Sequence, residues 1–287
     1  MTYSRLIAGT MTWGVWGKQL KKTEMMALMH YCIDQNITTF DHADIYGGYT
    51  TEADFGHAFA ESGIDRNRVQ LISKCGIQLI TDNRKSTVKH YNYNKDHIIW
   101  SAEKSIKDLK TDHLDLLLLH RPSPLMDVND IAEAISNLKK RGLIKAIGLS
   151  NFTPLQTDML SQIIEVTANQ IEFSVTEHSA LFDGSLDHMV TNNITPMAWS
   201  PLGIAFKEDN EQTRRIHTQL GELRETYNAT EDQLLLAWIL KHPSKIHPVI
   251  GTTTTQRIAA AAKALEMSLS LEDWFKILEA SRGIEVA

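Results

Sequence analysis

The sequence predicts one closed (β/α)8 TIM barrel, in which eight parallel strands alternate with helices packed outside them. Eight short apolar runs recur along the chain, and helical segments lie between them. Several runs are followed by a polar residue, and the C-terminal ends of barrel strands form the face where chemistry is done. A length of 287 residues suits one such barrel. We therefore expect residues 1–287 to form a single domain.

The strands are predicted from short apolar runs bounded by turn-forming residues. They are Arg5 to Gly9, Ile37 to Phe40, Val69 to Ser73, Leu114 to Leu119, Ile144 to Leu149, Ala168 to Ile171, Thr195 to Trp199 and His247 to Ile250. Eight is the number of strands that a closed barrel of this kind requires.

The helices are predicted from apolar residues spaced three and four apart. Such stripes are Met25, Leu28, Met29 and Cys32, and then Ile98, Ala102, Ile106 and Leu109. Thr23, with Met26 three residues later, is expected to stand just before the first helix. Thr153 is expected to precede a helix whose first position is Pro154, and Gly142 is expected to end another helix.

Two connections are longer than a minimal barrel needs. They run from Gly76 to Lys95 and from Pro201 to Thr230. Long loops in compact domains are usually functional or mobile, and both follow strands, so we expect them to form walls of a pocket on the catalytic face. The second connection is expected to contain an extra helix after the seventh strand. Leu271 to Gly283 is expected to form another extra helix.

Composition and charge limit the classes of binding partner and the cellular compartment that the sequence predicts. The net charge of −6 and the pI near 6.1 disfavour binding to nucleic acid or an anionic membrane. Cys32 and Cys75 are the two cysteines, which fits a reducing compartment and predicts no disulfide framework. MTYSRLIAGT lacks the apolar core of a secretory signal. We expect a cytoplasmic monomer or weak homo-oligomer.

Four polar residues that follow predicted strands form the candidate catalytic group. They are Asp41, Tyr46, Lys74 and His120. A phenol is protonated at neutral pH and can donate a proton if its anion is stabilised. An ammonium near the phenol would lower its pKa, and a carboxylate would keep that ammonium charged and aimed. A neutral imidazole can donate a hydrogen bond to an oxygen that acquires negative charge.

A phenol and an imidazole aimed at one oxygen suit the reduction of a carbonyl group. No side chain can deliver hydride, so this interpretation requires a nicotinamide cofactor. The alternative is structural, because Asp and His residues at strand ends often only cap the next helix.

The motifs DHADIYGGY, SKCG, LLLLHRP, GLSNF, NQIEFS and MAWSPLG occur in this order through nearly the whole chain. In this series the chain resembles the aldo-keto reductase superfamily of NADP-dependent barrel enzymes. The resemblance implies that Asp41, Tyr46, Lys74 and His120 are a catalytic tetrad. It also implies that Tyr46 is the acid for reduction, that the cofactor is NADPH, and that the substrate is a small aldehyde or ketone.

The resemblance also implies a set of cofactor-binding residues, from the nicotinamide end to the adenosine end. They are Gly9, Thr10 and Met11 at the first strand end, with Asp41 beside them; Ser150, Asn151 and Gln170 at the carboxamide; Trp199 on the nicotinamide ring; Ser200, Pro201, Leu202 and Gly203 at the pyrophosphate; and Gly251, Thr252, Thr253 and Arg257 at the adenosine.

Several of these residues have a purely structural alternative. Ser150 and Asn151 could instead cap the helix that begins near Thr153. Trp199 stands where the family commonly has tyrosine, and it could be a core aromatic residue. Arg257 suits a 2′-phosphate but could be an exposed helix residue.

The adenosine segment departs from the family pattern. A lysine often found there is absent, and Ala260 and Ala261 replace a Glu-Asn pair. The resemblance therefore leaves open a weaker or less strict preference for NADPH over NADH.

Substrate is expected above the nicotinamide. The predicted pocket residues are Trp13, Trp16, Tyr49 and Arg121, each of which could instead pack against a neighbouring loop.

Two other functions remain as rivals to a reductase. A cofactor-sensing regulatory subunit of the same fold would bind NADPH with little turnover. A metal-dependent hydrolase would use the histidines, and His42 with Asp44 could suggest a metal site. We reject it, because His42 and its neighbour Asp41 point to opposite faces of the strand and no second ligand pair such as H-x-H occurs. We expect no metal.

Overall fold

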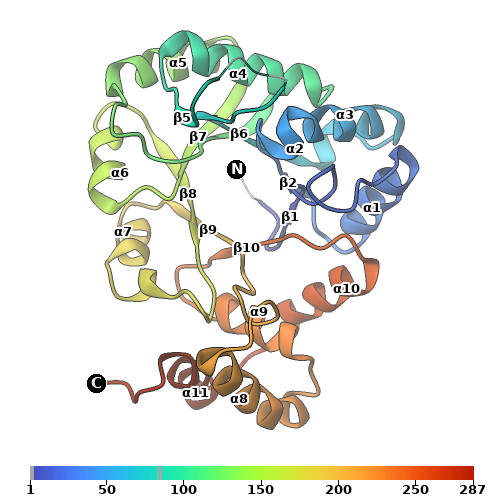
Figure 1. Ribbon diagram of the computed structural model, residues 1–287, viewed down its shortest axis with the longest axis vertical. Helices are drawn as coiled ribbons and strands as arrows, with labels where there is room; N and C mark the ends of the chain where they lie inside the picture. The colour runs from blue at the N-terminus through green and yellow to red at the C-terminus, as the bar shows by residue number, and fades with distance from the viewer. Residues whose placement is uncertain (1–2, 83, 85) are drawn as a thin grey trace.

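The computed structural model describes residues 3–82, 84 and 86–287, and its centre is a closed parallel barrel (Figure 1). Neighbouring strands around the barrel follow the order β1-β10-β9-β8-β7-β6-β3-β2. The strands are β1 (Ile7–Gly9), β2 (Thr39–Asp41), β3 (Gln70–Cys75), β6 (Leu114–Leu119), β7 (Ile144–Ser150), β8 (Val166–Glu172), β9 (Thr195–Trp199) and β10 (His247–Ile250). The eight predicted strands and the barrel class are confirmed; three strands have the predicted boundaries, and the ends of the other five differ by at most two residues.

Helices surround the barrel in Figure 1. They are α1 (Lys22–Asp34), α2 (Tyr46–Tyr49), α3 (Thr51–Glu61), α4 (Lys95–Asp108), α5 (Val128–Lys140), α6 (Pro154–Ser161), α7 (Ser185–Thr191), α8 (Glu211–Tyr227), α9 (Glu231–Leu240), α10 (Thr255–Lys263) and α11 (Leu271–Arg282). The two predicted extra helices are confirmed as α8, in the connection after the seventh barrel strand β9, and α11. These two helices pack against each other outside the ring.

The predicted helix ends are mostly confirmed. Thr153 caps α6 through its side chain, and Pro154 is the first helical residue. Gly142 follows α5 with a φ of +72°. The prediction for Thr23 is wrong, because α1 begins at Lys22, so Thr23 lies inside the helix and Lys21 precedes it. There the Glu24 carboxylate accepts the Lys21 backbone N–H at 2.7 Å and satisfies a helix-end donor.

The strand register aligns the residues that leave the barrel. Gly9 pairs with Asp41 across β1 and β2. Ser150 pairs with Gln170 across β7 and β8, and Trp199 follows on the adjacent strand, β9, opposite Glu172. Because all eight strands are parallel, their C-terminal ends meet at one edge, and the polar residues gather there.

Two layers of apolar side chains hold the barrel together. Inside it, Ile7, Ile72, Leu116, Leu118 and Met197 are among the residues that form a compact cluster with almost no exposure. Outside it, the strands face the apolar stripes of the helices, and the predicted stripe residues of α1 and α4 are buried. No described helix is long and apolar enough to cross a membrane.

The connection from Gly76 to Lys95 contains a feature that the sequence did not predict. Two short antiparallel strands, β4 (Ile77–Gln78) and β5 (His90–Tyr91), form a ribbon within it. This ribbon follows β3 directly, so it lies on the catalytic side of the barrel.

Candidate active site

Three members of the predicted tetrad meet in a buried hydrogen-bonded group. The Lys74 ammonium donates to Asp41 Oδ2 at 2.7 Å, to the Tyr46 hydroxyl at 3.1 Å and to the His42 carbonyl at 2.8 Å. Lys74 is 1% exposed and Asp41 2% exposed. An ammonium at this depth is stable only because an anion and further acceptors surround it. All three of its donors therefore have partners, and one of those partners is the phenol.

The backbone conformation after Tyr46 sets the direction of its side chain. Tyr46 begins the single turn α2, and the two residues after it, Gly47 and Gly48, have φ values of +61° and +63°. A Cβ on Gly47 would lie 2.5 Å from the Thr51 hydroxyl oxygen. Glycine is therefore required here by conformation and by space. It lets the chain turn sharply so that the phenol faces back toward β3.

His120 completes the group from the end of β6. Its ring lies 6.3 Å from the Tyr46 ring, edge to face. Burial lowers the pKa of His120 well below its usual value, and the nearby Lys74 and Arg121 charges lower it further. The imidazole is therefore neutral at physiological pH. Its buried Nδ1 has no hydrogen-bond partner.

The pKa of Tyr46 departs from the sequence expectation. Burial raises the pKa of the phenol, the Lys74 ammonium opposes that rise, and the Asp41 carboxylate adds to it. Lys74 acts in the predicted direction, but burial is the larger effect and the net shift is upward. Burial alone would lower the pKa of Lys74, whereas Asp41 and Tyr46 outweigh burial and raise it. The site thus holds a protonated phenol beside a charged ammonium.

The predicted carboxamide-binding residues form a continuous chain of contacts beside the tetrad. The Trp199 indole N–H donates to Asn151 Oδ1 at 2.9 Å, and the Asn151 amide donates to Ser150 Oγ at 2.8 Å. The Gln170 amide donates to Asp41 Oδ1 at 3.1 Å. These residues end three neighbouring strands. They therefore form a polar floor that is continuous with the catalytic group.

The capping alternative for Ser150 and Asn151 is wrong. Thr153 caps α6 itself, accepting the Gln156 backbone N–H. Asn151 instead has a φ of +62°, and Ser200 at the end of β9 has a φ of +51°. Residues other than glycine seldom adopt this conformation without a compensating role, and such strain often marks functional sites.

A tight turn follows β9 directly, and in it the Gly203 N–H donates to the Ser200 carbonyl at 2.7 Å. Gly203 has a φ of +52°, and a Cβ there would meet the Thr176 hydroxyl oxygen at 1.9 Å. The Ile204 backbone N–H donates to the same hydroxyl at 3.1 Å, which anchors the loop to the segment after β8. Glycine is therefore required at this position by conformation and by the packing of the loop on Thr176.

The loop after β10 also fits an anion. Thr254 precedes α10 without a side-chain cap, and Arg257 stands exposed in the first helical turn. A cation near a helix N-terminus opposes the helix dipole, whereas a bound phosphate would satisfy both the cation and the helix N–H groups. The Thr12 hydroxyl donates to the Gly251 carbonyl at 2.8 Å, joining this loop to the end of β1.

The remaining residues of the predicted cofactor set lie at the same edge. Gly9 ends β1, and the Thr10 hydroxyl donates to the Asp41 carbonyl at 3.0 Å. Met11 is 46% exposed beside them. Together with the floor and the two loops, these residues lie at the C-terminal edge of the barrel, where the strands end.

The comparison with protein families identifies the chain. The model of the Aldo/keto reductase family matches residues 5–282. The chain belongs to this family.

Relatives of this family member share its full length. An uncharacterized oxidoreductase, YcsN of Bacillus subtilis, is 41% identical, with 100% of this chain and 97% of the relative covered. A 6-dehydroglucose reductase of Agrobacterium fabrum is 38% identical, with 92% and 89% covered. An aldo/keto reductase of Klebsiella pneumoniae, solved with NADP and acetate, has the same fold at a TM-score of 0.79. It is 24% identical, with 94% of this chain and 89% of that chain covered.

Of the four residues that the sequence predicts for the substrate pocket of this aldo/keto reductase, two lie near the candidate catalytic group. The Trp16 ring lies 6.3 Å from the Tyr46 ring, and Trp16 is 45% exposed. The Arg121 guanidinium lies over the Trp199 ring at 5.3 Å. These two predicted pocket residues are therefore close to the catalytic group.

The prediction for Trp13 needs correction. The side chain is 1% exposed and packs against Phe40 and Phe55, with ring centres 6.1 and 5.8 Å away. An indole is large and apolar, so the space between β2 and α3 buries it instead of the pocket. Tyr49 is also buried, and its hydroxyl accepts the Leu79 N–H at 2.9 Å. Tyr49 therefore supports the loop after β3.

Sequence reasoning did not find the burial of two carboxyl groups: it considered Asp44 only as a metal ligand and did not consider Glu52. Burial raises the pKa of Asp44 to about 7 and that of Glu52 to about 7. Two serine hydroxyls, from Ser73 and Ser105, donate to Glu52. Ser73 is a polar residue directly after the apolar Leu71 and Ile72 of β3, which was the available signal. Among the described residues, no group of three or more His, Cys, Asp or Glu side chains is arranged to hold a metal ion.

Proposed function

We propose that this protein is an NADPH-dependent reductase that converts a small aldehyde or ketone to an alcohol, with Tyr46 as the proton donor. The observation that carries the proposal is the buried contact of Lys74 with both Tyr46 and Asp41. Family membership supports the same chemistry. Reduced nicotinamide, when bound, supplies the hydride.

The side chains have distinct roles in this proposal. The Tyr46 hydroxyl transfers its proton to the substrate oxygen as that oxygen gains electrons. The tyrosinate that remains is stabilised by the Lys74 ammonium, which Asp41 holds in place at 2.7 Å. The neutral His120 ring donates a hydrogen bond to the same substrate oxygen. General acid catalysis of this kind contributes about 10²- to 10⁴-fold to the rate.

The cofactor would lie along the edge described above. Ser150, Asn151 and Gln170 would orient the carboxamide, and the Trp199 indole would cover the ring. The turn from Ser200 to Gly203 would meet the pyrophosphate. Arg257, at the exposed start of α10, would bind the 2′-phosphate, and that charge favours NADPH over NADH.

The relatives and the pocket indicate which substrates to test. Trp16 supplies an exposed aromatic surface and Arg121 a polar group near the phenol. The 38% identical relative is named as a 6-dehydroglucose reductase. We infer that oxidised sugars belong in the test panel beside simple aldehydes and diketones. The free, buried thiols Cys32 and Cys75 agree with a cytoplasmic location.

The decisive experiment measures NADPH consumption against this panel for the wild type and for Tyr46→Phe. We expect wild-type turnover and a loss of at least about 10²-fold in kcat in the variant, because the proton donor is removed. NADPH binding should be retained, since the phenyl ring keeps its shape. Tight NADPH binding without turnover by the wild type would instead favour a cofactor-sensing subunit.

A further inference from the structure

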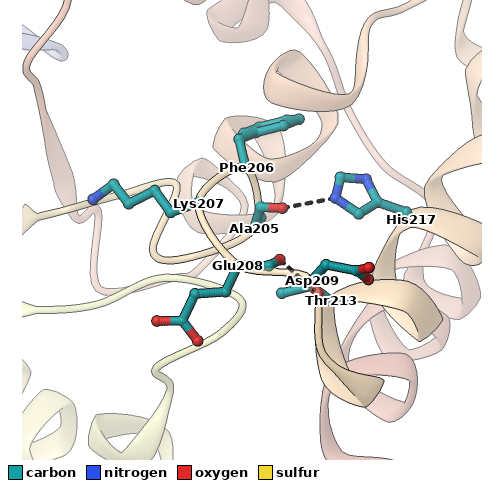
Figure 2. A pocket seen from close by; sticks show the side chains of 7 residues that line it. All are labelled: Ala205, Phe206, Lys207, Glu208, Asp209, Thr213 and His217. Carbon is teal, nitrogen blue, oxygen red and sulfur yellow. Dashed lines mark hydrogen bonds between the residues drawn. The ribbon is translucent and has the colours of Figure 1, made fainter.

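His217 on α8 is held between two hydrogen-bond acceptors. Its Nε2 lies 2.7 Å from the Ala205 carbonyl oxygen, and its Nδ1 lies 2.7 Å from Glu231 Oε2. Figure 2 shows the first of these contacts, in which the ring faces the loop that follows β9. The surrounding hollow has a volume of about 390 Å³ and is lined by that loop and α8.

The two contacts require a charged ring. A carbonyl oxygen and a carboxylate can only accept, so both ring nitrogens must carry hydrogen. A neutral imidazole has one N–H and could serve only one of the two partners. Burial lowers the pKa of His217, but the contacts with Ala205 and Glu231 outweigh it and the net shift is upward. The described histidines with clear downward pKa shifts are His42, His97, His120, His242 and His247.

The charged ring connects three parts of the cofactor edge. Gly203 ends the turn assigned above to the pyrophosphate, and Ala205 lies two residues after it. Glu231 is the first residue of α9. Two residues later, the Gln233 side chain donates to the Ala260 carbonyl of α10 at 3.1 Å. The β9 loop is thus tied through α9 to the helix that carries Arg257.

We propose that His217 is a positioning residue that, in its protonated form, holds the loop of residues 201–210 against α9 and thereby strengthens cofactor retention. The role in retention rests on the proposed function, because that proposal assigns the loop to the cofactor pyrophosphate. The role in holding the loop does not rest on the proposed function, because the contacts of His217 with Ala205 and Glu231 are present without a bound cofactor.

The charges around His217 favour its protonation. Asp209 raises the pKa of His217 together with Glu231, and Asp209 itself is paired with Arg214 at 2.6 Å. Lys207 and Glu208 line the same hollow, but in Figure 2 their side chains extend away from the ring. The anionic partners therefore dominate the field at the imidazole.

The sign of the pH dependence follows from the raised pKa. A group whose pKa is higher in the folded state contributes fully below its unfolded value, near 6.5 for histidine. The contribution disappears as the pH rises through the folded pKa. The loop should therefore be well held under mildly acidic conditions and should loosen as the pH rises.

The first test follows the loop in the protein without cofactor. Hydrogen–deuterium exchange of residues 201–210 is measured from about pH 6 to about pH 9, with correction for intrinsic exchange. In the wild type we expect protection that falls as His217 deprotonates, with an imidazole pKa above 6.5 by proton NMR. His217→Gln should lose this pH-dependent protection, because an amide does not titrate.

The second test measures binding of NADPH and of NADH by protein fluorescence over the same range. NADH lacks the 2′-phosphate, so any inflection seen with both nucleotides comes from the protein. At about pH 6, His217→Gln should bind more weakly by about tenfold or more, the loss expected for one charged hydrogen bond, and should approach the wild type at high pH. Glu231→Gln should move the inflection to lower pH.

His188→Gln is the matched control. His188 also pairs with a carboxylate, at 2.6 Å from Asp158, but it lies on α7. Equal loop protection in the wild type and His217→Gln at low pH would overturn the proposal. A pH-dependent loop in a protein that binds neither nucleotide would support the positioning of the loop and overturn the proposed function with its retention role.

Discussion

Lys74 is the residue on which the catalytic geometry depends most directly. It is almost fully buried, and its ammonium donates to Asp41, Tyr46 and a main-chain carbonyl. Removing one partner of a buried ion pair leaves an uncompensated charge, which costs about 3–5 kcal/mol. A single substitution therefore changes both chemistry and stability, and a test must separate the two.

The double variant Asp41→Asn with Lys74→Met removes both charges together and avoids a lone buried anion. Without the ammonium, the largest influence that lowers the pKa of Tyr46 is gone, so that pKa should rise further. Alcohol oxidation requires tyrosinate, so its rate at about pH 9 should fall at least about 100-fold. Steady-state oxidation over a pH series checks this. An unchanged pH profile would show that Lys74 does not set the ionisation of the phenol.

Arg257 is the residue that should decide cofactor preference. It is exposed in the first turn of α10, where a 2′-phosphate would pair with its guanidinium. Arg257→Ala should weaken NADPH binding by about tenfold or more and leave NADH binding nearly unchanged, as expected for one charge-assisted contact. Equilibrium binding of both nucleotides measures this. Lys263→Ala, at the other end of the same helix, is the control, and an equal loss for both nucleotides would contradict the assignment.

Among the elements, α3, β3 and α4 are joined by one buried carboxyl group. Glu52, at the start of α3, accepts hydrogen bonds from Ser73 on β3 and Ser105 on α4. Burial raises the pKa of Glu52 to about 7, while the two serine hydroxyls oppose that rise. The junction beneath Tyr46 therefore contains an acid that is partly protonated at neutral pH.

Glu52→Gln should change how stability depends on pH. Because the folded pKa of Glu52 is raised from 4.5 to about 7, its proton stabilises the fold most below the unfolded pKa. This stabilisation is lost as the pH rises through about 7. Relative to the glutamine variant, the wild type should lose up to about 3 kcal/mol between acidic and mildly alkaline pH. Urea unfolding at several pH values measures the difference.

Glu61→Gln in the same helix is the matched control for Glu52. Glu61 lies at the exposed end of α3 and pairs with Lys22 on the surface. Its substitution should leave the pH dependence of unfolding essentially as it is in the wild type. A parallel response of both variants would refute the role assigned to the buried carboxyl.

At the scale of the whole molecule, the extra helix α11 is attached to α9 by stacked indoles. The rings of Trp238 on α9 and Trp274 on α11 lie 4.9 Å apart and are nearly parallel. Each indole N–H donates to the backbone carbonyl of the other residue, at 3.1 and 2.9 Å. Packing and hydrogen bonding therefore act on the same pair, and α11 is an integral part of the fold.

Trp274→Ala should destabilise the protein by about 3–5 kcal/mol, because it removes a large stacked ring and leaves a cavity beside α9. Chemical denaturation of the whole chain measures this loss. Phe275→Ala is the adjacent control, since Phe275 is 37% exposed and should cost much less. Equal losses at the two positions would show that the stack contributes nothing special to the attachment of α11.

The sequence by itself determined the order of strands and helices and which polar residues follow the strands at the C-terminal edge of the barrel. Hydrophobic periodicity and position at the end of a strand are local properties of the sequence. Asp41, Lys74 and His120 were therefore found from the apolar runs in which they lie or which precede them. Because the strands are parallel, the residues at their C-terminal ends lie at the same edge of the barrel. Thr153 and Gly142 likewise act within a few residues of their helix ends, and both were predicted correctly.

Only the tertiary structure decided properties that depend on neighbours distant in sequence. Trp13 and Tyr49 were expected in the pocket but are buried, because packing between elements determines which face a ring covers. The net rise in the pKa of Tyr46 comes from burial, which no local pattern reveals. The contacts of His217 with Ala205 and Glu231 likewise exist only because folding brings a loop and two helices together.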